Sequence, residues 1–368
     1  MGFYDVIQQW KDFDFERYFA EVTDNDVLDS IYKEKLTEYD LLNLLSPKAK
    51  NHLERMARRA QEIKTQHFGN IISLYMPIYI SNFCTNNCTY CGFSKKNHIV
   101  RKHQSLEEIE EEAKEIAKHG VEHILMLTGE AHGLVTLDYL KDAVKVLKKY
   151  FNSVSIEVMP LEEWEYKELA DIGVDGLTVY QETYNEEIYD KVHLSGKKKD
   201  YHFRLNTPER GAKAGLRTIG IGPLFGLSEI KKEAFFAGLH LKYLTDKYLN
   251  SSFAISLPRI NPAEGGFQPD HPLDDITFVQ FMTAYRLFQV KADINISTRE
   301  IASFRDHLMH MGITKMSVGS KTDVGGYTEH DPSTCQFEIS DNRSAEETIE
   351  AIRKNGFQPI YKDWQQIK

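Results

Sequence analysis

Short apolar runs rich in β-branched residues alternate with segments of helical periodicity from about residue 71 onward. Runs of this kind fit strands that are buried on both faces, and their alternation with helices indicates βα units around a parallel sheet. We expect eight strands, at Ile72–Ile80, Glu122–Thr128, Ser153–Met159, Gly176–Tyr180, Thr218–Gly222, Ser252–Leu257, Asp293–Ser297 and Thr314–Val318. Eight strands with intervening helices predict an α/β protein with a (β/α)8 TIM-type barrel.

The segment between the first two runs shows how the helices are recognised. Ser105 and Glu108 have the spacing of a capping box, which predicts that a helix begins at Ser105. Its apolar residues recur at helical spacing, so they form the buried face: Leu106, Ile109, Ala113, Ile116 and Ala117. The acidic run from Glu107 to Glu115 is interpreted as the solvated face.

Both ends of the chain differ from the βα pattern. Residues 1–70 read as a helical extension that covers the barrel, and we interpret its aromatic residues as packing residues: Trp10, Phe13, Phe15, Tyr18 and Phe19. Residues 71–320 form the predicted barrel. Residues 321–368 are predicted to pack on the barrel as a C-terminal extension, with a helix near Ser344–Lys354.

Composition narrows the class of protein further. Of the 368 residues, 41% are hydrophobic and 27% are charged, and no apolar run approaches the length of a membrane helix. The formal charge of −10 argues against general nucleic-acid binding. The first residues lack a basic segment followed by an apolar one, so we expect no secretory signal and a cytoplasmic protein.

Three of the four cysteines fall within one motif, Cys84-x3-Cys88-x2-Cys91. Thiolates this close can hold a soft metal or an iron–sulfur cluster, and three of them would leave one iron of a cubane open to a non-protein ligand. Two competing interpretations are a structural zinc site, completed by Cys335, His98 or His103, and thiols that bind nothing. We interpret Gly220–Gly226 as a strand end rather than a dinucleotide loop, and Lys197–Lys199 as a surface loop.

Polar residues follow the predicted strands and should gather at one rim of the barrel, where such folds place their chemistry. The cysteine motif follows the first strand. The others are Gly129-Glu130, Gln181-Glu182-Thr183, Pro258-Arg259, Thr298-Arg299-Glu300 and Gly319-Ser320.

The motif, with Tyr90 before its last cysteine, resembles that of the radical S-adenosylmethionine (radical SAM) enzymes. Further stretches resemble one branch of them, the 2-iminoacetate synthases, which are the tyrosine lyases of thiamine biosynthesis: Tyr79-Ile-Ser-Asn82, Cys91-Gly-Phe-Ser94, Thr128-Gly-Glu130, Tyr180-Gln-Glu-Thr-Tyr184, Ser297-Thr-Arg-Glu300, Gly325-Gly-Tyr327 and Lys362-Asp-Trp364. The resemblance runs over nearly the whole chain. It implies a [4Fe-4S] cluster on Cys84, Cys88 and Cys91, with S-adenosylmethionine on the open iron.

The resemblance also assigns residues to the cofactor. Glu130 matches the acidic residue that holds the amino group of S-adenosylmethionine, although it could instead cap a helix. Glu182 matches a ligand of the ribose. Arg204 matches a partner of the cofactor carboxylate, unless it forms an ion pair at the surface. Tyr90 is placed with these cofactor-binding residues.

The implied reaction cleaves the Cα–Cβ bond of L-tyrosine to 2-iminoacetate (dehydroglycine) and p-cresol. Arg299 is expected to bind the tyrosine carboxylate, because a guanidinium offers two parallel hydrogen bonds. Tyr79 and Ser317 would complete that pocket, unless Tyr79 only packs the barrel. The acceptor of the phenolic proton stays open among Glu300, Arg259 and a water.

Related lyases and a non-catalytic protein compete with this interpretation. The hydrogenase-maturing tyrosine lyase carries a further C-terminal segment with cysteines that this chain, ending at Lys368, does not show. A tryptophan lyase is a second competing function, and a zinc-stabilised barrel that binds a partner without catalysis is a third. The resemblance implies an electron donor of the flavodoxin or ferredoxin type and contact with a thiazole synthase.

Overall fold

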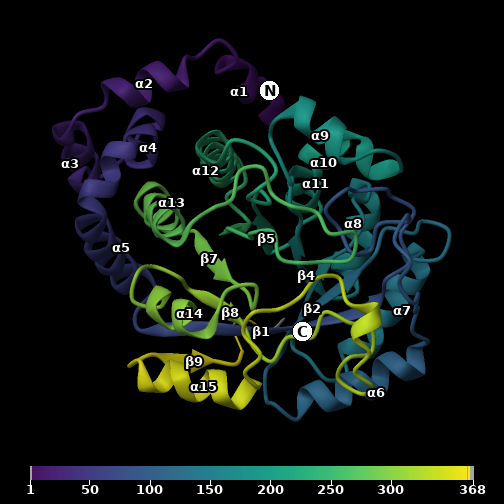
Figure 1. The fold of residues 1–368 in the computed structure, drawn as a ribbon. Coiled ribbons are helices and arrows are strands. Elements are labelled where there is room, and N and C mark those ends of the chain that lie inside the picture. Colours follow the sequence, from purple (N-terminus) through teal and green to yellow (C-terminus); the bar gives the residue numbers. More distant parts are fainter. Residues whose placement is uncertain (1, 363, 365–368) are drawn as a thin grey trace.

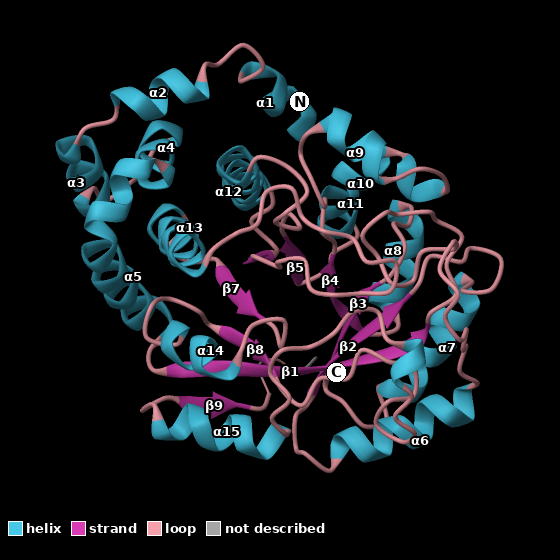
Figure 2. Ribbon diagram, viewed as in Figure 1, coloured by secondary structure: helices cyan, strands magenta, loops and turns pink. Residues whose placement is uncertain are grey.

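A closed parallel barrel forms the centre of the molecule (Figures 1 and 2). The computed structural model describes residues 2–362 and 364. Eight strands follow one another around the barrel, and the last pairs with the first: β1 (Ile71–Ser81), β2 (His123–Thr128), β3 (Ser153–Glu157), β4 (Val174–Thr178), β5 (Thr218–Ile221), β6 (Ser252–Ser256), β7 (Asp293–Ile296) and β8 (Lys315–Ser317). The predicted (β/α)8 barrel is therefore confirmed.

The strand bounds depart from the predicted ones by no more than two residues at any end. The largest shift is at β4, which begins at Val174 instead of Gly176 and ends at Thr178. A ninth strand, β9 (Gln358–Ile360), was not predicted; it pairs in parallel with the first residues of β1. Its three residues include Pro359, which argues against a strand in a sequence but is tolerated at a sheet edge.

Helices surround the barrel as expected: α6 (Leu106–Ala117), α7 (Leu137–Leu147), α8 (Glu163–Asp171), α9 (Glu186–Val192), η2 (Lys197–Lys199), α10 (Tyr201–Leu205), α11 (Thr207–Lys213), α12 (Ile230–Lys247), α13 (Asp275–Phe288) and α14 (Ala302–Leu308). The capping box of α6 is confirmed, since the Ser105 amide donates to Glu108 Oε2 over 2.7 Å and the Glu108 amide to Ser105 Oγ over 3.2 Å.

The interpretation of the acidic run on α6 is wrong at one position. Glu112 is fully buried, and its carboxylate accepts hydrogen bonds from the Tyr327 amide and from Gln104 Nε2, both over 3.0 Å. Periodicity places Glu112 beside the buried positions Ile109 and Ala113, but the sequence shows no partner for it. The partner comes from the segment beyond β8, which packs against α6.

The N-terminal residues form helices along one side of the barrel (Figure 1): α1 (Phe3–Gln9), α2 (Phe15–Glu21), α3 (Asp24–Tyr32), α4 (Glu38–Leu45), η1 (Pro47–His52) and α5 (Leu53–Phe68). Their aromatic residues pack, as predicted. The Trp10 ring, for example, lies 4.7 Å from that of Phe235 on α12, and Phe15 and Phe19 are buried. No described helix is long and apolar enough to span a membrane.

The segment after β8 crosses the mouth of the barrel before η3 (Pro332–Thr334) and α15 (Ala345–Lys354) (Figure 1). Val324 pairs with Tyr79 of β1, and the Ser340 amide donates to the Thr298 carbonyl over 2.8 Å. These contacts tie the C-terminal segment to two strands at the same rim. The segment therefore helps to enclose the interior at that end. Position 363 of the Lys362-Asp-Trp364 stretch lies outside the described residues.

Candidate active site

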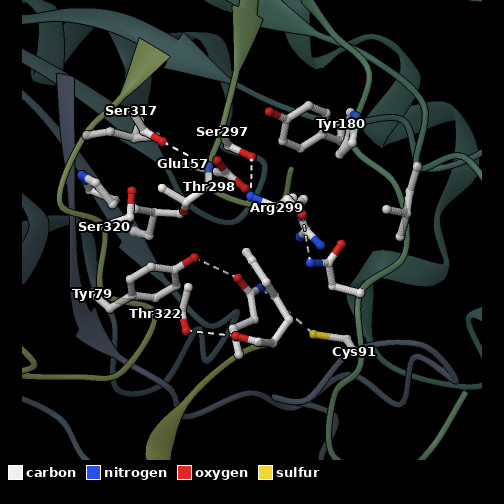
Figure 3. Close-up of a pocket in the computed structure, with 18 of the residues that line it drawn as sticks. Tyr79, Cys91, Glu157, Tyr180, Ser297, Thr298, Arg299, Ser317, Ser320 and Thr322 are labelled. Atoms are coloured by element: carbon white, nitrogen blue, oxygen red, sulfur yellow. Dashed lines mark hydrogen bonds between the residues drawn. The ribbon is translucent and has the colours of Figure 1, made fainter. Parts of the chain in front are cut away.

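A cavity of about 130 Å³ lies inside the barrel at the carboxyl ends of the strands. In Figure 3 the side chains of Tyr79, Glu157, Arg299 and Ser317 point toward this space, and the Cys91 sulfur lies at its edge. Every barrel strand, or the residues that follow it, contributes to the lining: Tyr75, Leu127, Glu157, Tyr180, Leu224, Pro258, Arg299 and Ser317. The expectation that polar residues gather at this rim is confirmed.

The cysteine loop follows β1 and is held from both sides. Asn82 Nδ2 donates to the Val100 carbonyl over 2.8 Å, and Arg101 donates to the carbonyls of Phe93 and Ser94 over 2.9 and 2.7 Å. Gly92 allows the C-terminal segment to approach, because a Cβ atom there would lie 2.2 Å from the carbonyl oxygen of Gln336. The loop is therefore held between the residues that follow it, Val100 and Arg101, and the C-terminal segment.

All three thiols of the motif are free, and Cys91 lines the cavity. Within the described residues, no three His, Cys, Asp or Glu side chains form a site for a single metal ion. A [4Fe-4S] cubane binds each thiolate to a different iron, so its cysteines stand farther apart than the ligands of one ion. Three free thiols on one loop, the last of which lines the cavity, fit such a cluster.

The zinc interpretation finds no such support among the described residues. His98 is exposed, and the His103 ring packs 4.3 Å from that of Tyr139. Cys335 lies close to the loop through its backbone, since its carbonyl oxygen would be 3.3 Å from a Cβ atom on Gly92.

A chain of buried charges lies beside the cysteine loop. Arg204 on α10 donates from Nη1 to Glu130 over 3.1 Å and from Nη2 to Glu182 over 3.2 Å. Lys198 Nζ lies 2.7 Å from the same Glu182 oxygen, and Asn86 donates to the second Glu130 oxygen over 2.7 Å. The structure thus brings together all three charged residues that the sequence assigned to the cofactor.

The helix cap at Glu130 and the surface ion pair at Arg204 are both wrong. Glu130 caps no helix: the next helix, α7, is capped by Thr136, whose hydroxyl accepts from the Tyr139 amide over 3.2 Å. Arg204 does not form a surface ion pair, because its side chain is 8% exposed and both of its partners are buried. Its Nε also donates to the Tyr180 carbonyl over 2.6 Å, which fixes the plane of the guanidinium.

Lys198 corrects the interpretation of Lys197–Lys199 as a surface loop. Its side chain is 12% exposed, whereas Lys197 and Lys199 are exposed. No local signal separates the three lysines, because the position of Lys198 depends on Asn86, whose Oδ1 accepts from the Lys198 amide over 3.0 Å. Burial alone would raise the pKa of Glu182, but Lys198 and Arg204 hold it below its ordinary value.

Glu182 adopts a φ of 72°, and it is the one described residue other than glycine with a positive φ. Such a backbone costs of order 1–3 kcal/mol and persists only where its surroundings enforce it. Here the Leu224 amide donates to the Glu182 carbonyl over 2.7 Å, while Lys198 and Arg204 hold the carboxylate. The strain therefore directs a carboxylate into the cavity.

Tyr90 packs between the cysteine loop and α9. Its hydroxyl donates to His193 Nε2 over 2.8 Å, because His193 Nδ1 donates to the Tyr189 carbonyl over 2.8 Å. Burial lowers the pKa of His193 to about 3, so the imidazole is neutral and can accept. The ring of Tyr90 is thereby fixed against Cys88 and forms part of the cavity wall.

The three residues predicted for the substrate carboxylate line the same cavity (Figure 3). The Arg299 guanidinium stacks 3.4 Å from the centre of the Phe337 ring and donates from Nη1 to the Arg259 carbonyl over 3.2 Å. The Tyr79 hydroxyl donates to Gln336 Oε1 over 2.8 Å, and Ser317 Oγ accepts from the Thr298 amide over 3.2 Å. Phe337 and Gln336 come from the C-terminal segment.

Two of the candidate acceptors of the phenolic proton bind each other instead. Arg259 donates from Nε and Nη2 to the two oxygens of Glu300, and from Nη1 to Asp275 over 2.6 Å. This bidentate pair connects the residues that follow β6 and β7.

Sequence reasoning missed Glu157, which stands at the end of β3 and lines the cavity. Burial, together with the negative charge of Glu182, raises the pKa of Glu157 to about 7. The charged or titratable groups that interact with it are Tyr75, Tyr79, Tyr180, Glu182, Lys198, Arg204 and Arg299. Glu157 lies near the carboxyl end of the predicted strand Ser153–Met159. This position, at the end of the barrel that carries the chemistry, is the sequence signal that could have identified it.

Comparison with known proteins agrees with this geometry. The profile of the radical SAM superfamily matches residues 78–236, and that of the biotin and thiamin synthesis associated domain matches residues 256–358. The 2-iminoacetate synthase of Escherichia coli K12 is 40% identical over 360 residues, which cover 97% of this chain and 96% of that protein. This chain belongs to the 2-iminoacetate synthase family. The Salmonella typhimurium enzyme of the same name is 42% identical over 89% of this chain and 88% of its own.

The fold of this family member also matches solved structures. The crystal structure of HydG, a maturase of the [FeFe]-hydrogenase, superposes with a TM-score of 0.90 at 29% sequence identity, over 95% of this chain and 80% of that one. Because its members are radical SAM proteins, the family uses a [4Fe-4S] cluster and S-adenosylmethionine. The three free thiols and the adjoining buried charges are the residues of this chain that fit these two groups.

Proposed function

We propose that this protein cleaves the Cα–Cβ bond of L-tyrosine to 2-iminoacetate and p-cresol, and thereby supplies the thiazole of thiamine. One observation carries the proposal: Cys91, the last cysteine of the cluster motif, lines the same cavity as Arg299, a guanidinium stacked on Phe337. Within the described residues no carboxylate pairs with Arg299, whose hydrogen bond goes to a backbone carbonyl. An amino acid carboxylate can therefore bind it beside the cluster.

The reaction balances with two electrons and one proton. L-Tyrosine and S-adenosylmethionine become 2-iminoacetate, p-cresol, methionine and 5′-deoxyadenosine. Cys84, Cys88 and Cys91 would hold the cluster, which would supply the electron for reductive cleavage of S-adenosylmethionine and thereby the radical chemistry that removes hydrogen from the tyrosine amino group. After the carbon–carbon bond breaks, the remaining 4-oxidobenzyl radical would take the second electron and two protons, one of which is the phenolic proton removed earlier, to become p-cresol.

The buried charges would orient the cofactor. We assign Glu130 to its amino group, Glu182 to its ribose hydroxyls and Arg204 to its carboxylate. The support is their position: Arg204 spans the two glutamates, and Glu182 lines the cavity. A carboxylate accepts from vicinal hydroxyls, and a guanidinium offers five N–H groups, of which three have partners here.

Arg299, Tyr79 and Ser317 would hold the tyrosine carboxylate. Arg299 provides two parallel N–H donors, while the hydroxyls of Tyr79 and Ser317 lie on strands that neighbour each other in the barrel. The stack on Phe337 fixes the plane of the guanidinium. A fixed plane limits the poses that the substrate can take, which favours attack on one hydrogen.

Glu157 would receive the phenolic proton. It is the cavity carboxyl whose pKa, about 7, lies near neutrality, so it can accept a proton and return it. Glu300 is bound by Arg259 and does not line this cavity, which favours Glu157 for that role. The same Glu157 carboxyl would then provide the proton that completes p-cresol.

We further propose that residues 71–320 act as the catalytic barrel, with residues 1–70 as its cover and residues 321–368 as an extension that closes the site. The electron donor would be a flavodoxin or ferredoxin, and a thiazole synthase would take up the unstable imine. Three thiolates that must stay reduced suit the cytoplasm.

The test is anaerobic incubation of the reconstituted protein with S-adenosylmethionine, dithionite and tyrosine, followed by analysis of the products. We expect p-cresol and 5′-deoxyadenosine, and neither from the Cys88→Ala variant, which should also contain less iron and sulfide. An indole derivative from tryptophan, without p-cresol from tyrosine, would assign the protein to a different lyase reaction.

A further inference from the structure

The chain segment that carries the cysteine loop has a charge opposite to that of the whole protein. The chain carries a formal charge of −10, yet residues 83–104 contain no Asp or Glu and four basic residues, Lys95, Lys96, Arg101 and Lys102. Arg101 is used inside the loop, where it donates to three backbone carbonyls within 3.0 Å. Lys95 and Lys96 are exposed.

A second basic segment lies directly against this loop. The Asn87 amide donates to the Ser195 carbonyl over 2.9 Å, and Cys88 pairs with His193 in an antiparallel bridge. Asn86 joins the two segments, because its carbonyl accepts from the Lys95 amide over 2.9 Å and its Oδ1 accepts from the Lys198 amide over 3.0 Å. Lys95 and the exposed Lys197 are thus on chain segments held together by one residue of the cluster loop.

These lysines are not held in ion pairs within the described part of the chain, although Lys197 shares a pocket with Glu130, Glu162 and Glu165. Lys95, Lys96 and Lys197 form no ion pair with the described residues, whereas the nearby Lys191 and Lys199 pair with Glu187 and Asp190 over 2.5 and 2.8 Å. Positive charges left unpaired on one side of an acidic protein create a local positive potential.

Apolar side chains are exposed on the same two segments. Phe83 precedes the first cysteine and is 36% exposed, and Leu194, whose amide donates to the Asn87 carbonyl over 2.9 Å, is 48% exposed. We call the surface formed by Phe83, Lys95, Lys96, Leu194 and Lys197 the docking face. Apolar residues among like charges are typical of a site for a protein of opposite charge.

We infer that the docking face binds the reduced electron donor, an acidic flavodoxin or ferredoxin, directly over the cysteine loop. The inference rests on the proposed function, which needs two electrons for each turnover. The loop that carries Cys84, Cys88 and Cys91 supplies Asn86 and Asn87 to this face, so a donor seated there lies next to the cluster residues. Charge complementarity would accelerate its encounter with an otherwise acidic enzyme.

A second copy of this chain fits the docking face less well. In a two-fold symmetric contact the same patch meets itself, and unpaired lysines would then face lysines. Like charges directly opposed disfavour such a contact. An acidic partner has no such cost.

The test compares two electron sources in two matched double variants. Lys95→Glu/Lys197→Glu reverses two charges on the docking face, and Lys213→Glu/Lys291→Glu makes the same change at exposed lysines before β5 and β7, at the opposite rim. Iron and sulfide content should equal the wild-type value in both. Formation of p-cresol is then measured with dithionite and with a reduced acidic flavodoxin.

We expect the docking-face variant to lose roughly tenfold or more of its flavodoxin-driven rate at limiting flavodoxin, while its dithionite-driven rate is unchanged. The control variant should match the wild type with both donors. Added salt should slow the flavodoxin-driven reaction of the wild type more than that of the docking-face variant. Salt screens the attraction between the lysines and an acidic donor, and the variant has lost two of these lysines.

Equal losses with both donors, or an unchanged flavodoxin-driven rate, would overturn the inference. So would an unchanged rate of p-cresol formation together with a lost transfer of the imine to thiazole synthase, since that would assign the face to the synthase. Failure of the wild type to form p-cresol with dithionite contradicts the proposed function itself and is thereby distinguished from failure of the docking face.

Discussion

Lys198 Nζ lies 2.7 Å from Glu182 Oε1 in the wall of the cavity, beside the cysteine loop. Glu182 carries the backbone strain of its positive φ, and Lys198 supplies one of two positive charges that keep its carboxylate ionised. The same ammonium favours the thiolates of Cys88 and Cys91, whose pKa values burial would otherwise raise further. One lysine therefore supports both the proposed ribose ligand and the proposed cluster ligands.

Replacement of this lysine should destabilise the fold. In Lys198→Met, Glu182 keeps Arg204 as its one cationic partner, so we expect the free energy of unfolding to fall by roughly 2 kcal/mol, less than the ~3–5 kcal/mol of a fully unpaired buried charge. Denaturant unfolding of the protein before reconstitution measures this. Lys199→Met is the control, because its partner Asp190 is exposed and the change should stay within about 0.5 kcal/mol. Equal effects at both positions would refute the buried pair.

Arg299→Lys should separate substrate binding from cofactor cleavage. An ammonium cannot form two parallel hydrogen bonds to a carboxylate and stacks less well on Phe337, so kcat/KM for tyrosine should fall roughly 10- to 100-fold. Formation of 5′-deoxyadenosine should fall less. Both products are measured in the same reaction, and an equal loss of p-cresol and 5′-deoxyadenosine would move Arg299 to the cofactor.

Gly92→Ala tests the contact between the cysteine loop and the C-terminal segment. The added Cβ atom would meet the Gln336 carbonyl at 2.2 Å, so the segment must move, and with it the Gln336 side chain that accepts from Tyr79. We expect a loss of about 1–3 kcal/mol in the free energy of unfolding and a higher KM for tyrosine. Gly133→Ala is the control, because no atom lies within 4 Å of its Cβ position. A neutral Gly92→Ala variant would show that the two segments move independently.

Glu157→Gln should change the pH dependence of both activity and stability. The wild-type carboxyl must be ionised to accept a proton, so kcat/KM for tyrosine should rise as pH increases through about 7. The glutamine variant should be slow, and its pH profile should lack this step. A variant with the wild-type profile would exclude Glu157 as the acceptor.

The same substitution should also change the free energy of unfolding, in a direction that depends on pH. The folded pKa of Glu157 lies above that of the unfolded chain, so the folded state binds more protons between these values and wild-type stability falls as pH rises toward about 7. Glu157→Gln removes this cost. We expect the variant to be more stable than the wild type at pH 8, by up to about 3 kcal/mol, and the difference to vanish below about pH 4.

The sequence by itself determined the barrel and the place of its chemistry. Buried parallel strands require continuous apolar runs, so β1 to β8 could be predicted to within about two residues. Polar residues after the strand ends, such as Glu182 and Arg299, had to share one rim. The cysteine motif is local as well. Its spacing places three thiols on one loop whatever the rest of the chain does.

The tertiary structure alone decided which charges are buried and paired. Lys198 differs from Lys197 and Lys199 because Asn86, more than 100 residues earlier, positions its backbone. Glu300 is paired with Arg259, which stands at the end of a neighbouring strand, and the sequence did not show this pair. Sequence patterns report what each residue prefers locally, whereas the pairing and the pKa of a buried group depend on atoms that only folding brings within hydrogen-bond distance.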